Sequence, residues 1–417
     1  MIGDFTFVHA ADVHLDSSLT GLARRDEEFS AAMRGATRRA FSNLVDLTLR
    51  EGADFLVIAG DLYDGTWKDN STGQFAVAQL ARLSRAGIPT FIVFGNHDAE
   101  SRVSRHLTLP PLVHKFANTR CETVTLDALG VAVHGRSYKD AATTEDISAT
   151  YCPPTPGLFN LAILHTSLDG HPGHARYAPC SLDQLRAAGH DYWALGHVHD
   201  RSVRSEHPHV VFSGNTQGRH IRETGAKGVS VVRVREGVVT EIDHQPVDEV
   251  RFALATLDGL QARDMGELLA GAADALRASV YGVSDRPTAA RLVVTASGAL
   301  YRQVLADPEW FVAEVRTQGS IMAEGLWIES VRVTGAPDGP ALQLLPEIAD
   351  LLASAGQDPE CGRALLSAVA PLLDKLPADA QDEDLAPLVA AARAGQADIL
   401  LAAALAAVQA RLLQSPT

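Results

Sequence analysis

The sequence predicts an α/β fold in which strands alternate with helices. Five apolar stretches of strand length, rich in Val, Ile, Phe or Leu, fall within the first 200 residues, at positions 5–10, 55–59, 90–94, 161–164 and 192–195. Helical periodicity of apolar residues covers positions 27–50 and 74–85, between the first three stretches. This order is typical of an open α/β sheet, in which ligands bind beyond the carboxyl ends of the strands.

A short polar cluster directly follows each of the five apolar stretches. The clusters are Asp12-Val13-His14, Gly60-Asp61, Gly95-Asn96-His97-Asp98, His165 and Gly196-His197-Val198-His199. A single Asp-x-His or His-x-His is weak evidence because it arises by chance, whereas Gly-Asn-His-Asp is more specific. The joint occurrence of all five, in order and each at a predicted strand end, predicts a two-metal phosphoesterase centre.

The residue types in these clusters match what two metal ions require. Two divalent ions roughly 3.5 to 4 Å apart need a shared anionic oxygen, further oxygen and nitrogen ligands, and open positions for water and phosphate. A mixed set of carboxylate, imidazole and amide ligands suits Mn, Fe or Zn better than Ca or Mg, which prefer oxygen alone. Asp61 is the natural bridge, Asp12, His14 and His199 can complete one ion, and Asn96, His165 and His197 can complete the other.

Further polar residues near these clusters have candidate roles. His97 is not needed as a ligand and is a candidate to protonate the leaving oxygen, with Asp98 orienting it by a hydrogen bond. A Gly-rich turn precedes four more residues that could contact phosphate: Arg219, His220, Arg222 and Lys227. For the remaining histidines a structural role is the better interpretation, with His9 and His134 packed in strands and His171 and His174 in a solvated loop.

The clusters resemble those of the calcineurin-like metallophosphoesterases and, within them, the SbcD-type DNA repair nucleases, above all the YhaO-type exonucleases. Three longer strings carry the finer resemblance: HAADVHLDS from His9, DYWALGHVH from Asp191 and GNTQGRHIRETGAKG from Gly214. The similarity covers roughly residues 1–245. It implies a metallophosphoesterase β-sandwich flanked by helices, with Asp12, His14, Asp61, Asn96, His165, His197 and His199 as metal ligands and His97 as the catalytic histidine.

One position departs from the pattern of the archaeal and eukaryotic nucleases of the family. They often carry a second catalytic histidine shortly after the bridging aspartate, and this chain has Asp64 there, in Gly60-Asp-Leu-Tyr-Asp64. Bacterial relatives share that substitution. The resemblance therefore leaves the role of Asp64 unassigned.

Three domains are expected along the chain: residues 1–248 as the phosphoesterase domain, 249–335 as a small α/β module and 336–417 as a helical tail. The module has predicted strands at 251–256, 291–295 and 326–333 and predicted helices at 265–278 and 301–315. In SbcD-type nucleases a capping domain that helps present DNA to the metals occupies this position. An ordinary structural lobe is the alternative.

The tail beyond a linker at residues 336–340 is rich in Ala and Leu, and three or four short helices are expected, broken by Pro371, Pro377 and Pro387. An apolar stripe can pack within the tail or dock on a partner helix, and consists of Leu401, Leu405, Val408 and Leu412. In the family a C-terminal helical segment binds the coiled coil of an SbcC-type or YhaN-type ATPase. This chain has no GxxxxGK[ST] motif of its own, so an ATPase partner is a hypothesis.

Composition limits the remaining possibilities. The net charge of -15 argues against a protein that holds DNA by bulk electrostatics, but residues 336–417 carry 11 acidic against 4 basic residues and so supply nearly half of it. Four cysteines without CxxC spacing indicate neither a disulfide framework nor a thiolate zinc site. The longest apolar run, residues 399–408, is too short to span a membrane and no leader pattern precedes the first strand, so we expect a cytoplasmic protein.

These observations favour a Mn-dependent phosphodiesterase acting on DNA, which by the resemblance is a 3'-to-5' exonuclease with some single-strand endonuclease activity. One alternative is a phosphatase or phosphodiesterase for small molecules such as nucleotides. Another is a non-enzymatic scaffold, although scaffolds of this kind usually lose ligands. Related nucleases pair through the catalytic domain, so a homodimer through Leu19, Leu22 and Phe29 is a further hypothesis, for which core packing is an equal explanation.

Overall fold

The fold is that of a computed structural model, which describes residues 2–17, 31–33, 35–65, 70–100, 107–169, 177–280, 286–323, 325–335, 346–373 and 386–412. The chain divides into two units, one built on residues 1–18 and 32–251 and the other on residues 252–417. Residues proposed above for a dimer contact (Leu19, Leu22, Phe29), a solvated loop (His171, His174) and a linker (336–340) lie outside the described part.

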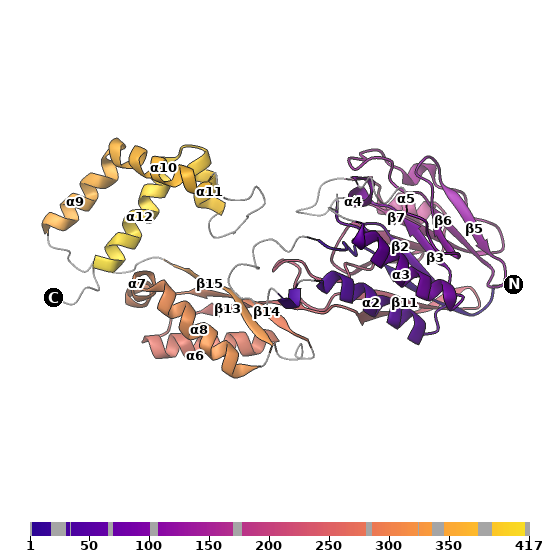
Figure 1. Ribbon diagram of the computed structural model, residues 1–417, viewed down its shortest axis with the longest axis horizontal. Coiled ribbons are helices and arrows are strands. Elements are labelled where there is room, and N and C mark those ends of the chain that lie inside the picture. The colour runs from indigo at the N-terminus through magenta and orange to yellow at the C-terminus, as the bar shows by residue number, and fades with distance from the viewer. Residues whose placement is uncertain are drawn as a thin grey trace. The chain divides into compact units, whose positions relative to one another are not determined.

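Two six-stranded sheets form the first unit (Figure 1). The first has the order β12 (Val238–Pro246), β11 (Gly228–Arg235), β1 (Phe5–Ala10), β2 (Phe55–Ala59), β3 (Thr90–Val93), β4 (Val113–Lys115). The second has the order β5 (Glu122–Leu126), β6 (Val131–Gly135), β7 (Phe159–His165), β8 (Tyr192–Gly196), β10 (His209–Phe212), β9 (Ser202–Glu206). All five predicted strands are present and each has a parallel neighbour. The ends of β1 and β2 are as predicted, and those of β3, β7 and β8 differ by one or two residues.

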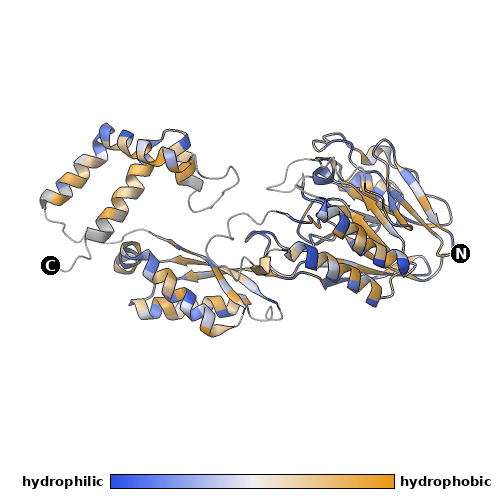
Figure 2. Ribbon diagram, viewed as in Figure 1, coloured by the Kyte–Doolittle hydropathy of each residue, from blue (hydrophilic) through white to orange (hydrophobic). Residues whose placement is uncertain are grey.

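The alternation of side chains along each strand builds a four-layer sandwich. Leu56 and Ile58 of β2 pack with helices α2 (Ala36–Arg50) and α3 (Ser71–Arg85), whereas Phe55 and Val57 pack against the second sheet. On the other side of the second sheet, helix α5 (Leu182–Ala187) packs against its outer face. Figure 2 shows these strands as largely hydrophobic while α2 and α3 also carry hydrophilic residues. The predicted α/β sandwich flanked by helices is therefore confirmed.

The second unit begins with a three-stranded sheet in the order β13 (Arg251–Asp258), β14 (Thr288–Thr295), β15 (Leu326–Thr334). Helices α6 (Met265–Val280), α7 (Gly298–Ala306) and α8 (Pro308–Met322) accompany it. The single helix predicted over 301–315 is wrong, because Asp307 and Pro308 divide it. The Asp307 side chain accepts a hydrogen bond from the Trp310 N–H and Pro308 takes the first position of α8, which together start a new helix.

The tail contains α9 (Pro346–Gln357), α10 (Pro359–Leu373), α11 (Ala386–Arg393) and α12 (Ala397–Leu412) among its described residues. The break predicted at Pro371 is wrong, because α10 continues through this residue to Leu373. Helix α12 packs against α7 and the other tail helices, and within it Leu400 is buried while Val408 of the predicted stripe is exposed. Among the described helices, none combines the length and apolarity needed to cross a bilayer.

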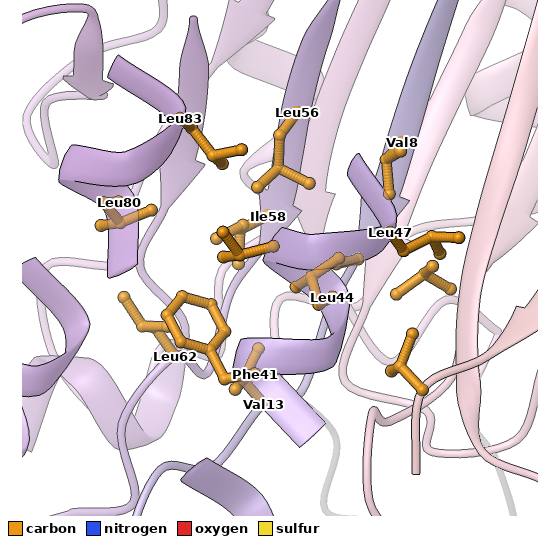
Figure 3. Packing of buried hydrophobic residues seen from close by; sticks show 14 of the residues in the cluster. Val8, Val13, Phe41, Leu44, Leu47, Leu56, Ile58, Leu62, Leu80 and Leu83 are labelled. Carbon is orange, nitrogen blue, oxygen red and sulfur yellow. The ribbon is translucent and has the colours of Figure 1, made fainter. Parts of the chain in front are cut away.

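The first unit depends on the cluster of apolar side chains between its first sheet and α2 and α3 (Figure 3). Leu44 of α2 is fully buried there beside Leu56 and Ile58 of β2. Because interiors are packed at crystal-like density, removal of one such side chain leaves a cavity that neighbouring strands fill only in part. The strands that end at the polar clusters are therefore held in place by this layer.

Replacing Leu44 by Ala should lower the free energy of unfolding of the first unit by about 2 to 5 kcal/mol, because buried contacts are lost and a cavity remains. Urea denaturation followed by circular dichroism measures the change. The control is Val238→Ala on β12, where the side chain is 61% exposed, and the expected change is below about 0.5 kcal/mol. Equal losses in the two variants would contradict the core assignment.

Candidate metal centre

The seven side chains predicted as ligands come from strand ends of both sheets. Asp12 and His14 follow β1, Asp61 follows β2, and Asn96 begins the short helix α4 (Asn96–Glu100) after β3. From the second sheet, His165 ends β7, while His197 and His199 follow β8. Since the two sheets face each other, their carboxyl ends bring residues almost 190 positions apart into one site.

Interatomic distances show that these side chains converge. The Asp61 Oδ2 lies 3.4 Å from His165 Nε2 and 3.8 Å from His14 Nε2. The Nε2 atoms of His14 and His199 are 3.2 Å apart, and Asn96 Oδ1 is 3.0 Å from His165 Nε2. Two groups have ligand atoms that all lie within 4.8 Å of one another: Asp12, His14 and His199, and Asp61, His165 and His197. A third group of this kind contains His14, Asp64 and His97.

The backbone around the site is adapted to close approach. Asp12, His14, Asp61 and His197 all have positive φ, which L-residues adopt at a cost and which is common at functional sites. A Cβ on Gly60 would lie 2.3 Å from His165 Nδ1, and one on Gly95 would lie 2.3 Å from Asp61 Oδ1. Glycine at these two positions therefore allows the ligand side chains to lie against the backbone.

The buried charges fit a cation. Burial raises the pKa of Asp12 above its ordinary value, against the lowering effect of His199 and His165. Burial alone would raise the pKa of Asp61 too, but the imidazoles of His165, His14 and His97 outweigh it and hold the pKa below its usual range. Burial lowers and Asp61 raises the pKa of His165, with a net rise to about 9. Two buried carboxylates that rely on imidazolium charge are a donor set into which divalent ions fit.

His97 lies at the edge of this cluster, and its neighbour is Asp64. The side chain of His97 is 38% exposed, and its Nδ1 is 3.1 Å from Asp64 Oδ1. Burial lowers the pKa of His97, but the carboxylates of Asp64 and Asp61 outweigh it and raise the pKa above its ordinary value. Asp98, predicted to orient His97, instead accepts hydrogen bonds from backbone N–H groups of three residues at the strand ends, Leu62, Tyr63 and Gly95. Asp64 therefore provides a contact through which a carboxylate can orient the His97 ring.

The segment from Gly214 to Glu223 contributes a residue that sequence reasoning missed. Glu223 is buried, and its Oε1 lies 2.6 Å from His199 Nδ1. It resembles an ordinary helix-capping or surface glutamate in the sequence, and its four-residue spacing from Arg219 was the one available signal. Arg219 lies beside both Glu223 and Asp64, whereas the His220 side chain is half exposed near Glu223.

The other candidates fall outside the cluster. The Lys227 ammonium is buried and donates to Asp200 Oδ1 at 3.0 Å, so it anchors the backbone after His199. His9 is fully buried and contacts the Tyr192 hydroxyl and the Leu195 carbonyl, and His134 contacts Thr123 and Asn160. Both histidines are hydrogen-bonded core residues, in agreement with their interpretation from the sequence.

Comparisons with known proteins agree with this geometry. The family model described as Calcineurin-like phosphoesterase matches residues 5–201, and the model for the middle domain of metallophosphoesterase YhaO matches residues 252–335. The chain is 34% identical over 316 residues to the "uncharacterized metallophosphoesterase YhaO" of Bacillus subtilis, which spans 75% of this chain and 74% of that protein. It is 30% identical over 216 residues to the "DNA double-strand break repair protein Mre11" of Methanopyrus kandleri, or 46% of this chain and 44% of the relative.

Among solved structures, the chain is similar to a dimetal phosphatase from Danio rerio, with 14% sequence identity and a TM-score of 0.33. The similarity covers 56% of this chain and 93% of the phosphatase chain.

The burial of His9 gives the protein a measurable sensitivity to acid. Desolvation lowers the pKa of folded His9 to about 3, from 6.5, only partly opposed by the Leu195 carbonyl. The contribution of neutral His9 to the free energy of unfolding is therefore fully present above pH 6.5. It is lost as the pH falls from 6.5 toward 3, because in this range His9 is protonated in the unfolded chain but not in the folded one. At pH 4 the loss from this residue is about 3 kcal/mol relative to pH 7.

His9→Gln removes this dependence, so the stability difference between wild type and variant should narrow from pH 7 to pH 4. Urea denaturation at several pH values, with a chelator present throughout, measures it. His114→Gln, at a half-exposed histidine on β4, is the control. A stability difference that stays constant over this pH range would show that His9 titrates normally.

Proposed function

The chain belongs to the YhaO group of calcineurin-like metallophosphoesterases, and we propose that it is a metal-dependent phosphodiesterase that acts on DNA. The observation that carries the proposal is the convergence of seven nitrogen and oxygen donors at the carboxyl ends of two sheets, with the half-exposed His97 at their edge. We assign Asp12, His14 and His199 to one ion and Asn96, His165 and His197 to the other, with Asp61 shared. This assignment is supported by the position of Asp61 beside both His14 and His165, and by that of Asn96 beside His165.

The family fold uses divalent metal ions, and the mixed donors favour Mn over Ca or Mg, with Fe and Zn as the next choices. When bound, the ions would neutralise charge on the phosphate and activate a water as the nucleophile. The buried histidines and carboxylates hold their positions against solvent by contacts with one another. This arrangement keeps the reacting phosphate in a fixed geometry, which lowers the barrier by proximity and orientation.

His97 is the proposed general acid. Asp64 lies beside Nδ1 of its ring, so the proton to be delivered to the substrate is the one on Nε2. The raised pKa of His97 keeps a larger share of the ring protonated near neutral pH, so it can deliver a proton to the departing 3' oxygen of the preceding nucleotide. Hydrolysis of that bond releases a nucleotide with a 5' phosphate.

Support for DNA as the substrate comes from the relatives. Relatives from Methanopyrus kandleri and Sulfurisphaera tokodaii are both named DNA double-strand break repair protein Mre11. We propose 3'-to-5' exonuclease activity with some single-strand endonuclease activity, a capping role for residues 249–335, and substrate contact by His220. The half-exposed His220 ring is accessible from solvent while its neighbour Glu223 is buried.

The tail is the proposed docking segment for an SbcC-like or YhaN-like ATPase. Large apolar side chains remain exposed on its helices, with Leu351 on α9 at 68% and Leu372 on α10 at 61%. Exposed apolar side chains of this size are suited to helix-in-groove contacts with a partner.

The nuclease proposal is tested with a linear duplex labelled at its 3' ends, beside a panel of nucleotide substrates, in Mn²⁺ and in Mg²⁺. Wild type should release labelled 5'-mononucleotides in Mn²⁺. His97→Ala should retain two ions per chain and lose about 10² to 10⁴-fold in turnover, because a general acid contributes that much. Metal content is measured by mass spectrometry of the purified protein.

His114→Ala is the matched control, since the His114 side chain is as exposed as that of His97 but lies on β4. Its turnover should equal that of wild type. Turnover confined to the nucleotide panel would favour a small-molecule phosphoesterase, and a centre that takes up no metal would favour a scaffold.

The partner proposal is tested by co-expression with an SbcC-like or YhaN-like ATPase and size-exclusion chromatography. Leu351→Asp combined with Leu372→Asp should abolish co-elution, because a charge in an apolar contact is not compensated. Val238→Asp, an equally exposed position on β12 of the first unit, is the control and should leave co-elution unchanged. Co-elution of the double variant would remove the tail from the contact.

A further inference from the structure

Two of the histidines proposed to hold the same ion, His14 and His199, have their Nε2 atoms close together. The Nε2 atoms of His14 and His199 are 3.2 Å apart, and both belong with Asp12 to the same group of candidate ligands. For both rings to offer a lone pair at Nε2, each must carry its proton on Nδ1. What lies at the two Nδ1 atoms therefore decides whether the site is ready for an ion.

A carboxylate lies at each Nδ1 atom. Glu223 Oε1 is 2.6 Å from His199 Nδ1, and Asp64 Oδ1 is 3.2 Å from His14 Nδ1. A carboxylate only accepts hydrogen bonds, so each contact stabilises the Nδ1–H form of its ring. Both carboxylates also lie beside the Arg219 guanidinium, which carries a fixed positive charge and only donates hydrogen bonds. Each carboxylate is therefore placed between a histidine ring and a cation.

Arg219 links the two carboxylates. Its guanidinium lies 3.5 Å from Asp64 and 3.7 Å from Glu223, and its side chain is only 17% exposed. The guanidinium is also 3.4 Å from His199 Nδ1, but a guanidinium cannot accept a hydrogen bond. The His199 Nδ1–H group therefore donates to Glu223, which is also the nearer of the two at 2.6 Å. With a carboxylate on each side, the Arg219 guanidinium is engaged within the protein. Its contact with a phosphate of the substrate stays a prediction.

Glu223 also fixes the segment that carries Arg219. Its second oxygen accepts hydrogen bonds from the Arg219 backbone N–H at 2.7 Å and from the Asn215 side-chain amide at 3.0 Å. One buried carboxylate, that of Glu223, thus contacts both the His199 ring and the backbone of the loop that carries Arg219. The segment lies between the two ranges matched by family models, which end at residue 201 and resume at residue 252.

We propose that Asp64, Arg219 and Glu223 form a carboxylate brace that holds His14 and His199 in the Nδ1–H form and so positions both Nε2 atoms for the same ion. The proposal rests on the metal centre of the proposed function. It assigns Asp64, Arg219 and Glu223 as positioning residues, and it makes one of the two ions depend on them. Among the ligands assigned to the other ion, His165 has a backbone partner at Nδ1, the Ala59 carbonyl at 2.9 Å, in place of a carboxylate.

The test is a titration of metal-free protein with Mn²⁺ by calorimetry. Wild type should bind two ions, and Glu223→Gln should weaken one step by about 10 to 100-fold while the other step changes little, as is typical when the partner of a ligating histidine is lost. Arg219→Met should weaken the same step. In the variant that combines Glu223→Gln and Arg219→Met, the fold-loss in Mn²⁺ affinity of this step should be smaller than the product of the two single fold-losses, because the two residues act as one unit.

Glu51→Gln is the matched control, an ion-paired glutamate of the same unit that lies 3.0 Å from Arg233 and away from the centre. A second readout reports positioning directly. Nitrogen NMR of the labelled histidines in metal-free protein should show His199 in the Nδ1–H form in wild type and a mixture of tautomers in Glu223→Gln. Thermal unfolding of the metal-free variants verifies that each is folded.

Two unchanged binding steps in Glu223→Gln, with His199 still in the Nδ1–H form, would overturn the brace while leaving the metal centre intact. A wild-type protein that binds no Mn²⁺ would overturn both the brace and the metal centre. A wild-type protein that binds two Mn²⁺ ions but does not cleave DNA would contradict only the proposed substrate. The three results are distinct.

Discussion

A carboxylate removed from water has to be surrounded by compensating charge, and Asp61 imposes this requirement on the first unit. It follows β2 in the first sheet, yet its nearest imidazole, His165 at 3.4 Å, ends β7 in the second sheet. The two sheets must therefore meet with their carboxyl ends side by side. The aromatic layer between them, in which the rings of Phe7 on β1 and Tyr192 on β8 meet edge to face with centroids 5.1 Å apart, keeps this alignment.

The same site is costly for the backbone. Positive φ at Asp12, His14 and Asp61 is unfavourable for residues with a Cβ, by roughly 1 to 2 kcal/mol each. The flanking strands offset this cost, because β1 and β2 are buried almost throughout and are paired on both sides within the first sheet. Strain concentrated at the ends of rigid strands is a way to hold ligands in a fixed geometry before any ion arrives.

The sequence predicted what local pattern determines and not what distant side chains determine. Strand ends followed by Asp, Asn and His could be recognised because each polar cluster directly follows an apolar stretch. The structure brings the seven predicted ligand side chains close to one another. Glu223 was invisible because its partner His199 is 24 residues away and nothing nearby marks it as buried. Asp98 was paired with His97 by adjacency, and nothing in the sequence indicates that its carboxylate accepts hydrogen bonds from the distant backbone N–H groups of Leu62 and Tyr63. The division at Pro308, by contrast, was readable from Asp-Pro.

The segment from Gly214 to Glu223 also reaches the end of the first unit. Gln217 donates to the Val250 carbonyl at 2.6 Å and accepts from the Glu249 N–H at 2.7 Å, directly before β13 begins at Arg251. Six residues further on, Glu223 holds His199. Both contacts involve buried side chains, so neither can be broken without exposing an unpaired polar group. One short segment therefore connects the geometry of a proposed metal ligand, His199, to the point where the chain enters its second unit.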